Sequence, residues 1–417
     1  MSDFRVIVAT DSAGIGGGAQ KVAMLSAVGL AARGISTTVF AGAGERPSDA
    51  PDSLTIRSLD WPEEPPTTAR TVRNAWNETA YRAMRDEIAR GEAMGVTPER
   101  TIVHLHLWAV TLSPSVVVAA QDAGARVIVS LHDYHAACPQ GQFYDVRANA
   151  ICLRKPGGAA CVSRHCLASR TWLGKAAHLY RWSVQRGRGG LPTRVRHFGI
   201  LSDGSESVLR PYLPSDARLH RLRNPILAER LPRVEAERNT AFVHSGRVSK
   251  EKNPRIVAEA AARIGAPARF IGDGPIRAEI EALALPDVSF SGWVDSAGIA
   301  VELARARALV LSSVWYEVSP LAPLEALARG IPVLASSVTT TTRDIVEGET
   351  GFVFQSGNAD DLAAKMRLLQ DDATCEAMSR AAYARFWADP PTPERHIDDL
   401  LAVYDEMLAE TPSRMAA

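Results

Sequence analysis

The alternation of short apolar runs with helical segments limits what this chain can fold into more than any other feature. Apolar, β-branched runs at 4–10, 35–41, 102–108, 126–132 and 198–202 predict strands, and residues 19–33 predict a helix between the first two. After Arg223-Asn224-Pro225 the pattern restarts, with strands expected at 242–245, 268–271, 288–290, 308–312 and 332–335. Strands separated by helices form parallel sheets, so we predict an α/β fold with two doubly wound sheets. Ligands of such sheets bind beyond the carboxyl ends of the strands.

Length and composition agree with this division. The chain has 417 residues, and at about 150 residues per domain this suggests two or three domains. Hydrophobic residues make up 46% and charged residues 23%, which excludes collagen-like and disordered classes. Lys+Arg and Asp+Glu both number 47, so the whole chain has no bias toward nucleic acid. The N-terminus has no secretory signal pattern and no apolar run approaches ~18 residues, so we expect a cytoplasmic protein.

A glycine-rich segment, Gly14 to Gln20, follows the first expected strand. Glycines let the backbone approach a ligand closely, and the helix that follows directs N–H groups at an anion. A tight turn with nothing bound is the alternative. A dinucleotide is less favoured, because Ala19 stands at the sixth position of the fingerprint and no acidic residue follows clearly about 20 residues later. We therefore predict that this turn approaches a phosphate.

Cations follow the strand that opens the second half. Arg247, Lys250 and Lys252 lie between that strand and the next helix. A guanidinium and an ammonium there suit a diphosphate, and a solvated charged loop is the alternative. Gly272-Asp273-Gly274-Pro275, after the next strand, indicates a turn and taken alone says little about function.

Two glutamates flank the start of a later helix. Glu317 lies in a loop, Ser319 is expected to be the N-cap and Pro320 the first helical residue. Glu325 then falls one to two turns into a helix made of Leu and Ala. An acid in such surroundings needs a partner or a ligand hydroxyl, and an ion pair with a neighbouring Arg is the alternative.

These motifs together resemble the GT-B glycosyltransferases of family 4. Their signature is a pair of glutamates written E-x7-E, which Glu317 and Glu325 match. The resemblance covers nearly the whole chain and is most specific between 246 and 354. Further matching segments are Gly246-Arg247, Lys252-Asn253, Gly272-Asp273-Gly274-Pro275, Gly292-Trp293-Val294, Glu325-Ala326-Leu327-Ala328, Gly330-Ile331-Pro332-Val333, Thr350-Gly351-Phe352-Val353-Phe354, Gly16-Gly17-Gly18-Ala19 and His132-Asp133. One departure is Val318-Ser319-Pro320, where the family commonly has a Gly-Phe-Gly type run.

The resemblance implies a GT-B fold, with two Rossmann-like domains facing each other across a cleft. Residues 1–223 would form the acceptor-side domain, with a cysteine-containing loop excursion at about 134–170. Residues 224–390 would bind the nucleotide sugar, and 391–417 would carry a helix that packs back on the first domain. The implied reaction is retaining transfer of a sugar from a UDP- or GDP-linked donor to a glycan, lipid-linked or small-molecule acceptor. No divalent metal or other cofactor would be needed at the reaction centre.

The resemblance also assigns roles to individual residues. The implied catalytic residues are His132, Glu317, Arg247 and Lys252. The implied donor-binding residues are Gly16, Gly17, Gly18, Arg247, Lys252, Gly274, Glu317, Ser319, Leu321 and Glu325. Arg247 and Lys252 would hold the diphosphate, Glu325 the ribose, and His132 would lie by the reacting sugar. A GT-B phosphorylase or epimerase, and a non-catalytic scaffold that binds sugar nucleotides, remain alternatives.

Four cysteines lie within 29 residues: Cys138, Cys152, Cys161 and Cys166. Four thiols suffice for a tetrahedral structural zinc site, although no CxxC pair is present. His135 or His165 could replace one of them. An iron–sulfur cluster and four free thiols in a loop are the alternatives.

The stretch from Val146 to Ser202 contains no Asp or Glu. It carries many Arg and Lys residues and the aromatic residues Trp172, Tyr180 and Trp182. Residues 170–185 could form a basic amphipathic helix at an anionic membrane surface, with Arg181 and Arg186 in contact with it. A groove for a phosphorylated or lipid-diphosphate acceptor, and a solvated surface with cation–π contacts, are alternatives. No nucleic-acid-binding module is present in the sequence.

Overall fold

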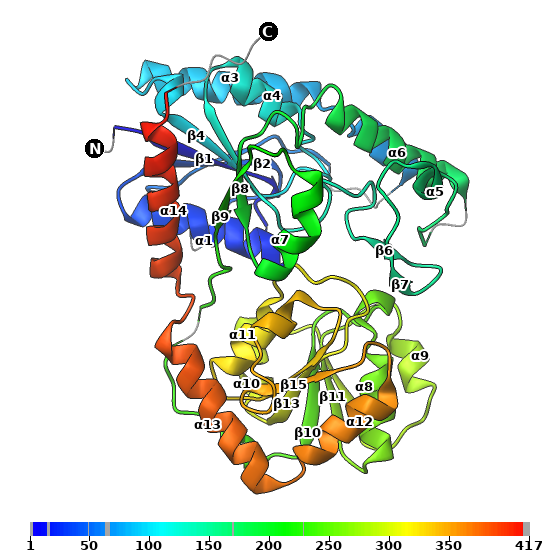
Figure 1. Cartoon of the computed structure of the whole chain (residues 1–417). Coiled ribbons are helices and arrows are strands. Elements are labelled where there is room, and N and C mark those ends of the chain that lie inside the picture. The colour runs from blue at the N-terminus through cyan, green and yellow to red at the C-terminus, as the bar shows by residue number, and fades with distance from the viewer. Residues whose placement is uncertain are drawn as a thin grey trace.

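The computed structural model describes residues 3–14, 17–48, 50–62, 67–168, 171–227 and 229–411. The chain folds into two lobes, each built around one parallel sheet with helices on both faces (Figure 1). The predicted pair of doubly wound sheets is thereby confirmed. A small antiparallel hairpin, β6 (Tyr144–Asp145) with β7 (Ala150–Ile151), belongs to the excursion after β5.

The first sheet has seven strands in the order β3-β2-β1-β4-β5-β8-β9. The strands are β1 (Arg5–Ser12), β2 (Ser36–Ala43), β3 (Thr55–Ser58), β4 (Thr101–Leu105), β5 (Arg126–Ser130), β8 (His197–Ile200) and β9 (Arg218–Arg221). The helices of this lobe are α1 (Gly18–Ala32), α2 (Thr68–Arg73), α3 (Glu78–Ala93), α4 (Ser115–Asp122), α5 (Ala159–Val162), α6 (Trp172–Arg186) and α7 (Asp203–Leu209), with short 3-10 turns η1 (Pro98–Arg100) and η2 (Arg210–Tyr212). Alternate residues of β1 fill two cores, because Ile7 packs with α3 and α4 while Val6 packs with α1.

The second sheet has six strands in the order β12-β11-β10-β13-β14-β15. Its strands are β10 (Ala241–Ser245), β11 (Ala268–Ile271), β12 (Val288–Gly292), β13 (Ala306–Leu311), β14 (Val333–Ser336) and β15 (Gly351–Phe354). Its helices are α8 (Arg255–Arg263), α9 (Arg277–Glu281), α10 (Ser296–Leu303), α11 (Leu321–Leu327), α12 (Ala359–Leu368) and α13 (Asp372–Ala388), with 3-10 turns η3 (Ala236–Arg238), η4 (Lys250–Lys252) and η5 (Thr340–Arg343). Phe242 and Val243 on β10 face the two opposite cores of this lobe.

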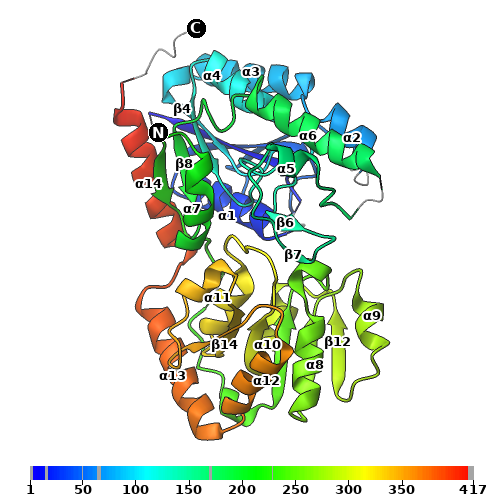
Figure 2. The same ribbon diagram turned by 45° about the vertical axis from the view of Figure 1, so that its right-hand side comes forward.

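The last helix, α14 (Pro393–Ala409), returns to the first lobe and lies beside α1 (Figures 1 and 2). Ile397, Leu400 and Tyr404 of α14 are buried in the core that α1 shares with the first sheet. The two helices cross closely at Gly29, where an added Cβ would come within 2.5 Å of the Ile397 side chain. This confirms the predicted helix that crosses back to the first domain.

Two segments of the chain pass between the lobes, and they lie side by side. The Ile226 N–H donates to the Pro391 carbonyl at 3.0 Å. The Arg223 guanidinium pairs with Asp389 at 3.0 Å. The outgoing and returning crossings are therefore joined to each other.

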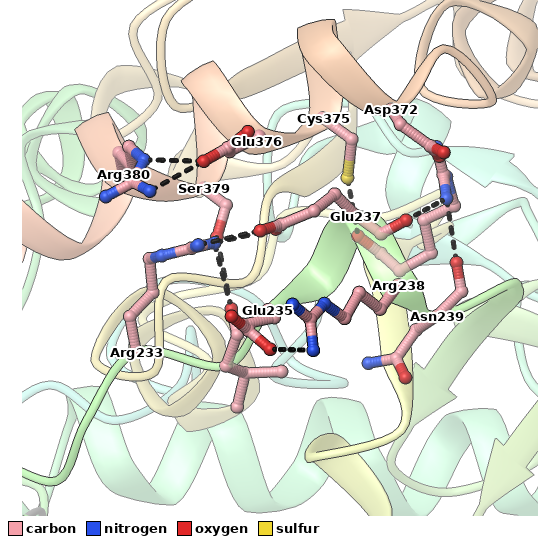
Figure 3. A network of polar contacts seen from close by, with 12 residues as sticks. Arg233, Glu235, Glu237, Arg238, Asn239, Asp372, Cys375, Glu376, Ser379 and Arg380 are labelled. Atoms are coloured by element: carbon pink, nitrogen blue, oxygen red, sulfur yellow. Dashed lines mark hydrogen bonds and ion pairs between the residues drawn. The ribbon is translucent and has the colours of Figure 1, made fainter.

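Below these crossings, η3 is fastened to α13 by a polar network (Figure 3). Arg233 donates to Glu237 at 2.7 and 2.8 Å and to the Ser379 hydroxyl at 2.6 Å. Arg233 also fills the space beside Gly330, where an added Cβ would lie 2.7 Å from its side chain. The network fixes the start of the second lobe against the helix that ends it.

The lobes touch through the loop that follows β13. Val318 is buried in the core of the first lobe. Its carbonyl accepts hydrogen bonds from Ser202 of the first lobe and Thr340 of the second. Gly204 at the start of α7 packs against Thr340 so closely that an added Cβ would lie 2.4 Å from Thr340 Cβ. The loop that follows β13 is thus held by residues of both lobes.

The structure differs from the predicted elements at the ends of two central strands and at sheet edges. The predicted strands 102–108 and 126–132 end earlier, at Leu105 and Ser130, so that His106 and His132 stand in the loops beyond them. The edge strands β3, β9 and β15 were not predicted. In the ranges that the structure describes, no helix is both long enough and apolar enough to cross a bilayer.

Candidate active site

Lys252 and Glu317 meet where two neighbouring strands end. Strand β10 pairs with β13, and the loops after these strands carry the two residues. Lys252 Nζ lies 2.6 Å from Glu317 Oε1, and Ser313 Oγ donates to the same oxygen. Glu317 is only 4% exposed, so its carboxylate is compensated by an ammonium and a hydroxyl. Two residues predicted separately for the site are therefore in direct contact.

Asn253 and Ser312 hold this pair in position. Asn253 ends η4 in the left-handed region at φ 47°, a conformation that asparagine tolerates better than most residues. The Ser312 hydroxyl donates to the Lys252 carbonyl at 2.8 Å. Trp315 lies beneath the ammonium, with 5.9 Å between Lys252 Nζ and the ring centroid.

Arg247 lies in the same loop as Lys252 but has no such compensation. Its side chain is exposed, and it forms no ion pair or hydrogen bond with any residue in the described part of the chain. The backbone around it is tightly packed, since an added Cβ at Gly272 would lie 2.3 Å from the Gly246 carbonyl oxygen. One at Gly274 would lie 2.3 Å from the Val248 carbonyl oxygen. Gly274 is therefore required for packing, and Arg247 is a free cation on a well-fixed loop.

Glu325 on α11 lines a cavity of about 610 Å³ between the lobes. Lys21 of α1, Ser296 of α10 and Arg329 line it as well. Burial raises the pKa of the Glu325 carboxyl, and the charges of Lys21 and Arg329 partly oppose this. The carboxyl accepts no hydrogen bond from the described residues, whereas Lys21 reaches across the lobes to Ser296 Oγ at 3.2 Å. The carboxyl is thus free to accept hydrogen bonds from a ligand.

The glycine-rich turn faces the start of α11. Gly17 is the exposed N-cap of α1, and an added Cβ at Gly18 would lie 3.6 Å from the Leu321 side chain. Helix α11 begins at Leu321 with Pro320 before it, so the predicted N-cap role of Ser319 is wrong. The Ser319 carbonyl instead accepts from Asn224 at 2.9 Å. Gly16 lies outside the described residues.

His132 follows β5 on the side of the first lobe. Its Nε2 lies 2.9 Å from Nδ1 of His106, and burial lowers its pKa to about 4. His132 forms no hydrogen bond with Lys252, Glu317 or Arg247, all of which the structure describes. The next residue, Asp133, accepts from His135 at 2.8 Å. His132 is therefore a neutral imidazole near neutral pH, held by the first lobe.

Several side chains of this region were not singled out from the sequence: Lys21, Ser313, Thr340 and His106. Ser313 stands four residues before Glu317 and Lys21 one turn after Gly17, so both could have been found by their spacing from predicted residues. Thr340 and His106 act across the fold, and nothing in the local sequence marks them.

Cys161 and Cys166 lie beside α6, and all five cysteines are free thiols. Lys175 is 2% exposed, and its ammonium lies 3.4 Å from the sulfur of Cys166 and 3.7 Å from that of Cys161. No group of three or more His, Cys, Asp or Glu within the described ranges is arranged to hold a metal ion. Zinc at Cys138, Cys152, Cys161 and Cys166 therefore stays a prediction, which metal analysis of protein purified without chelator would decide.

Residues 228–385 match a family model described as "Glycosyl transferases group 1". A curated relative, the sulfoquinovosyl transferase SQD2 of Arabidopsis thaliana, is 31% identical over 169 residues. That match covers 39% of this chain and 32% of the relative, so the chain spans about a third of that protein's length.

Solved structures resemble the chain over almost its whole length. A sucrose-phosphate synthase from Thermosynechococcus elongatus gives a TM-score of 0.70 at 18% identity, covering 98% of this chain and 100% of that one. The Anabaena protein Alr3699/HepE, solved with UDP and glucose, gives 0.65 at 14% identity, covering 96% and 100%. The two sheets with their flanking helices match the two Rossmann-like domains of the GT-B fold, and residues 228–385 resemble a group 1 glycosyltransferase domain.

Proposed function

We propose that this protein is a retaining glycosyltransferase that moves a sugar from a nucleoside diphosphate sugar to an acceptor. The observation that carries the proposal is the cationic loop after β10. The guanidinium of Arg247 has no partner among the described residues, and the same loop carries Lys252, which pairs with Glu317. As the bond from sugar to diphosphate breaks, negative charge grows on the leaving diphosphate. Arg247 and Lys252 would stabilise that charge without a divalent metal at the reaction centre.

Glu325 is the residue that we propose for the nucleoside. A carboxylate without a protein partner can accept hydrogen bonds from both hydroxyls of a ribose, and it lines a cavity of suitable size. Since one structural neighbour was solved with UDP and glucose, we propose a UDP- or GDP-linked sugar as the donor. The N-terminus of α1 at Gly17 and Gly18 would approach the distal phosphate. Glu317 and His132 would lie by the donor sugar.

Retention needs no protein nucleophile in this proposal. The acceptor hydroxyl attacks the face of the sugar that the diphosphate leaves, and the leaving phosphate oxygen takes the proton. The acceptor would be a glycan, a lipid-linked sugar or a small molecule bound against the first lobe.

The experiment is a donor screen followed by two variants. Arg247→Ala should lower kcat/KM for transfer by about 100-fold, because a cation that stabilises the developing charge is lost. Glu325→Gln should raise the donor KM by roughly tenfold or more, because charged hydrogen bonds to the ribose are weakened.

The matched control is Arg255→Ala. Arg255 is also a cation at the start of α8, but it pairs with Glu259 on an exposed surface. Full transfer activity in Arg247→Ala would contradict the proposal. Phosphate-dependent cleavage of a glycoside would favour a phosphorylase, and nucleotide binding without transfer to any acceptor would favour a scaffold.

We also propose that the first lobe contacts an anionic membrane through α6. The outward side of this helix is apolar, with Trp172 55%, Leu173 70% and Tyr180 51% exposed. Leu153, at 86%, is exposed in the same acid-free stretch, and Lys155 beside it is exposed. Exposed aromatic and aliphatic side chains suit the boundary between headgroups and acyl chains, and a nearby cation favours an anionic surface.

Arg181 does not belong to this surface, contrary to the expectation from sequence. Its guanidinium donates to the carbonyls of Ala109 and Pro139, both at 3.1 Å. The sharper test is therefore the double variant Trp172→Ser/Leu173→Ser in a vesicle sedimentation assay. It should bind phosphatidylglycerol vesicles several-fold more weakly than the wild type. Absence of wild-type binding at low ionic strength would contradict the membrane proposal and leave the transferase proposal untouched.

A further inference from the structure

A pair of buried imidazoles stands behind His132. His106 follows β4, and its backbone N–H donates to the Ala9 carbonyl at 2.9 Å, which fixes it to β1. His106 Nδ1 and His132 Nε2 are 2.9 Å apart, and the two rings stack with centroids 5.1 Å apart. His106 is 1% exposed, whereas His132 is half-buried. One ring is therefore sealed inside the lobe and the other borders its surface.

Both rings carry one proton each near neutral pH. Burial holds the pKa of His106 well below its usual range and lowers that of His132 to about 4. A neutral imidazole has one N–H and one nitrogen lone pair. The proton between His106 Nδ1 and His132 Nε2 belongs to one of the two rings, so the other ring must carry its own proton on its outer nitrogen.

Either ring could donate the hydrogen bond between His106 and His132. The His106 nitrogen that faces away from His132 shows which ring donates it. His106 Nε2 is buried and has no hydrogen-bond partner among the residues that the structure describes. If His132 donated to His106, then His106 would have to carry its own proton on Nε2, as a buried N–H with no acceptor. Proteins rarely leave a buried N–H without an acceptor. The arrangement in which His106 Nδ1–H donates to His132 Nε2 avoids this and puts the proton of His132 on Nδ1.

We propose that His106 is a positioning residue that holds His132 as the Nδ1–H tautomer, so that His132 offers an N–H donor to an oxygen of the donor sugar. The inference rests on the proposed function for the identity of the ligand, and on the imidazole pair alone for the tautomer. His132 Nδ1 is not among the buried unpartnered atoms and forms no hydrogen bond with any described residue, so it is open to a ligand. An N–H there suits a hydroxyl or ring oxygen rather than a cation.

A third histidine, His104, restricts the movement of the His106 ring. His104 lies on β4 with its ring 4.2 Å from that of His106, centroid to centroid. Its Nδ1 lies 2.6 Å from the Tyr404 hydroxyl of α14, and its Nε2 lies 2.8 Å from Ser130 Oγ on β5. His106 is thus packed between a fully bonded ring and His132, and it has little freedom to turn. This fixes which of its nitrogens faces His132.

The test is the tautomer of His132 in the full-length protein, read from the imidazole nitrogen shifts after labelling histidine with ¹⁵N. A His132→Asn variant assigns its signals among the ten histidines. We expect a protonated Nδ1 and an unprotonated Nε2 in the wild type. In His106→Phe, which keeps a ring but removes the donor, His132 should shift toward the Nε2–H tautomer. In His106→Asn, whose amide nitrogen stands near the position of Nδ1, the wild-type pattern should persist.

The matched control is His220→Phe. His197 and His220 form a second buried pair, with their ring nitrogens 3.0 Å apart, and this change should leave the His132 signals unaltered. A protonated Nε2 in wild-type His132, or an unchanged tautomer in His106→Phe, would overturn the inference. Melting temperatures show whether each variant is folded.

Sugar transfer provides the second readout. His106→Phe should lower kcat on the order of tenfold with little change in donor KM, and His106→Asn should restore most of it. Equal losses in both variants would contradict the positioning role. If the wild type transfers sugar from no donor, the proposed function fails, while the nitrogen shifts still decide the tautomer.

Discussion

The Arg233 guanidinium lies between the Glu237 carboxylate and the Ser379 hydroxyl, as Figure 3 shows. Hydrogen bonds from Arg233, more than any other cause, lower the pKa of Glu237 to about 2. A carboxyl whose pKa falls on folding contributes stability that is present above its unfolded pKa, about 4.3, and is lost as the pH falls toward 2. One residue therefore makes the attachment of η3 to α13 sensitive to acid.

We expect Glu237→Gln to lower the free energy of unfolding by about 2 kcal/mol at neutral pH. The difference from the wild type should shrink as the pH falls from about 4 to about 2, because the wild-type carboxyl is then protonated as well. Urea unfolding of both proteins across this pH range measures the difference in their free energies of unfolding. Glu376→Gln, which alters an exposed i,i+4 pair with Arg380, is the control and should change stability by less than about 0.5 kcal/mol. A constant difference at every pH would contradict the assignment.

For individual residues, the sequence predicted which of them lie near one another but not which of them pair. Lys252 and Glu317 were both expected in the cleft because each follows a strand. Their 2.6 Å contact joins positions 65 residues apart, and it depends on β10 and β13 being neighbours. Likewise Arg181 belongs to a basic stretch, but only the packing of α6 shows that it faces carbonyl groups. Spacing along the chain says nothing about such pairings.

Among the elements, those with strong periodicity were predicted best. Helix α14 spans Pro393–Ala409, within the segment 391–417 that was expected to carry a helix. Strands β3 and β9 escaped prediction because they stand at sheet edges and expose alternate polar residues, such as Arg57 and Arg218. A short edge strand lacks the apolar run that marks a central strand. The sequence predicted two doubly wound sheets with the site beyond the carboxyl ends of their strands, and only the structure shows the order of those strands.

The crossing of α1 and α14 leads to a prediction about Gly29. Gly29→Val should destabilise the protein by about 2 kcal/mol or more, because its side chain would overlap Ile397. Thermal unfolding measures it. Ala32→Val on the exposed side of α1 is the control and should have a small effect. Ile397→Ala combined with Gly29→Val should recover part of the loss, and no recovery would contradict the contact as the cause.

For the whole molecule, the cleft depends on how tightly the lobes meet at α7 and η5. Gly204→Val would force its side chain against the Thr340 backbone, whose Cα already lies 2.8 Å from an ideal Cβ. We expect the lobes to separate, which should increase the radius of gyration in X-ray scattering and lower sugar transfer by about tenfold or more. Arg210→Ala, an exposed change after the same helix, should do neither. An unchanged radius with lost activity would contradict an effect on closure.

The paired crossings at Ile226 and Pro391 give the molecule a mechanical property that neither lobe has alone. Two covalent connections that are joined side by side form a hinge with a defined axis. We expect such a paired connection to let the lobes rotate about one axis and to oppose twisting and translation. Because any swing then follows the same arc, the groups on the two sides of the cleft meet in the same alignment each time. Cutting either link would leave the two lobes joined by a single segment, with the same folds but no fixed path for closing.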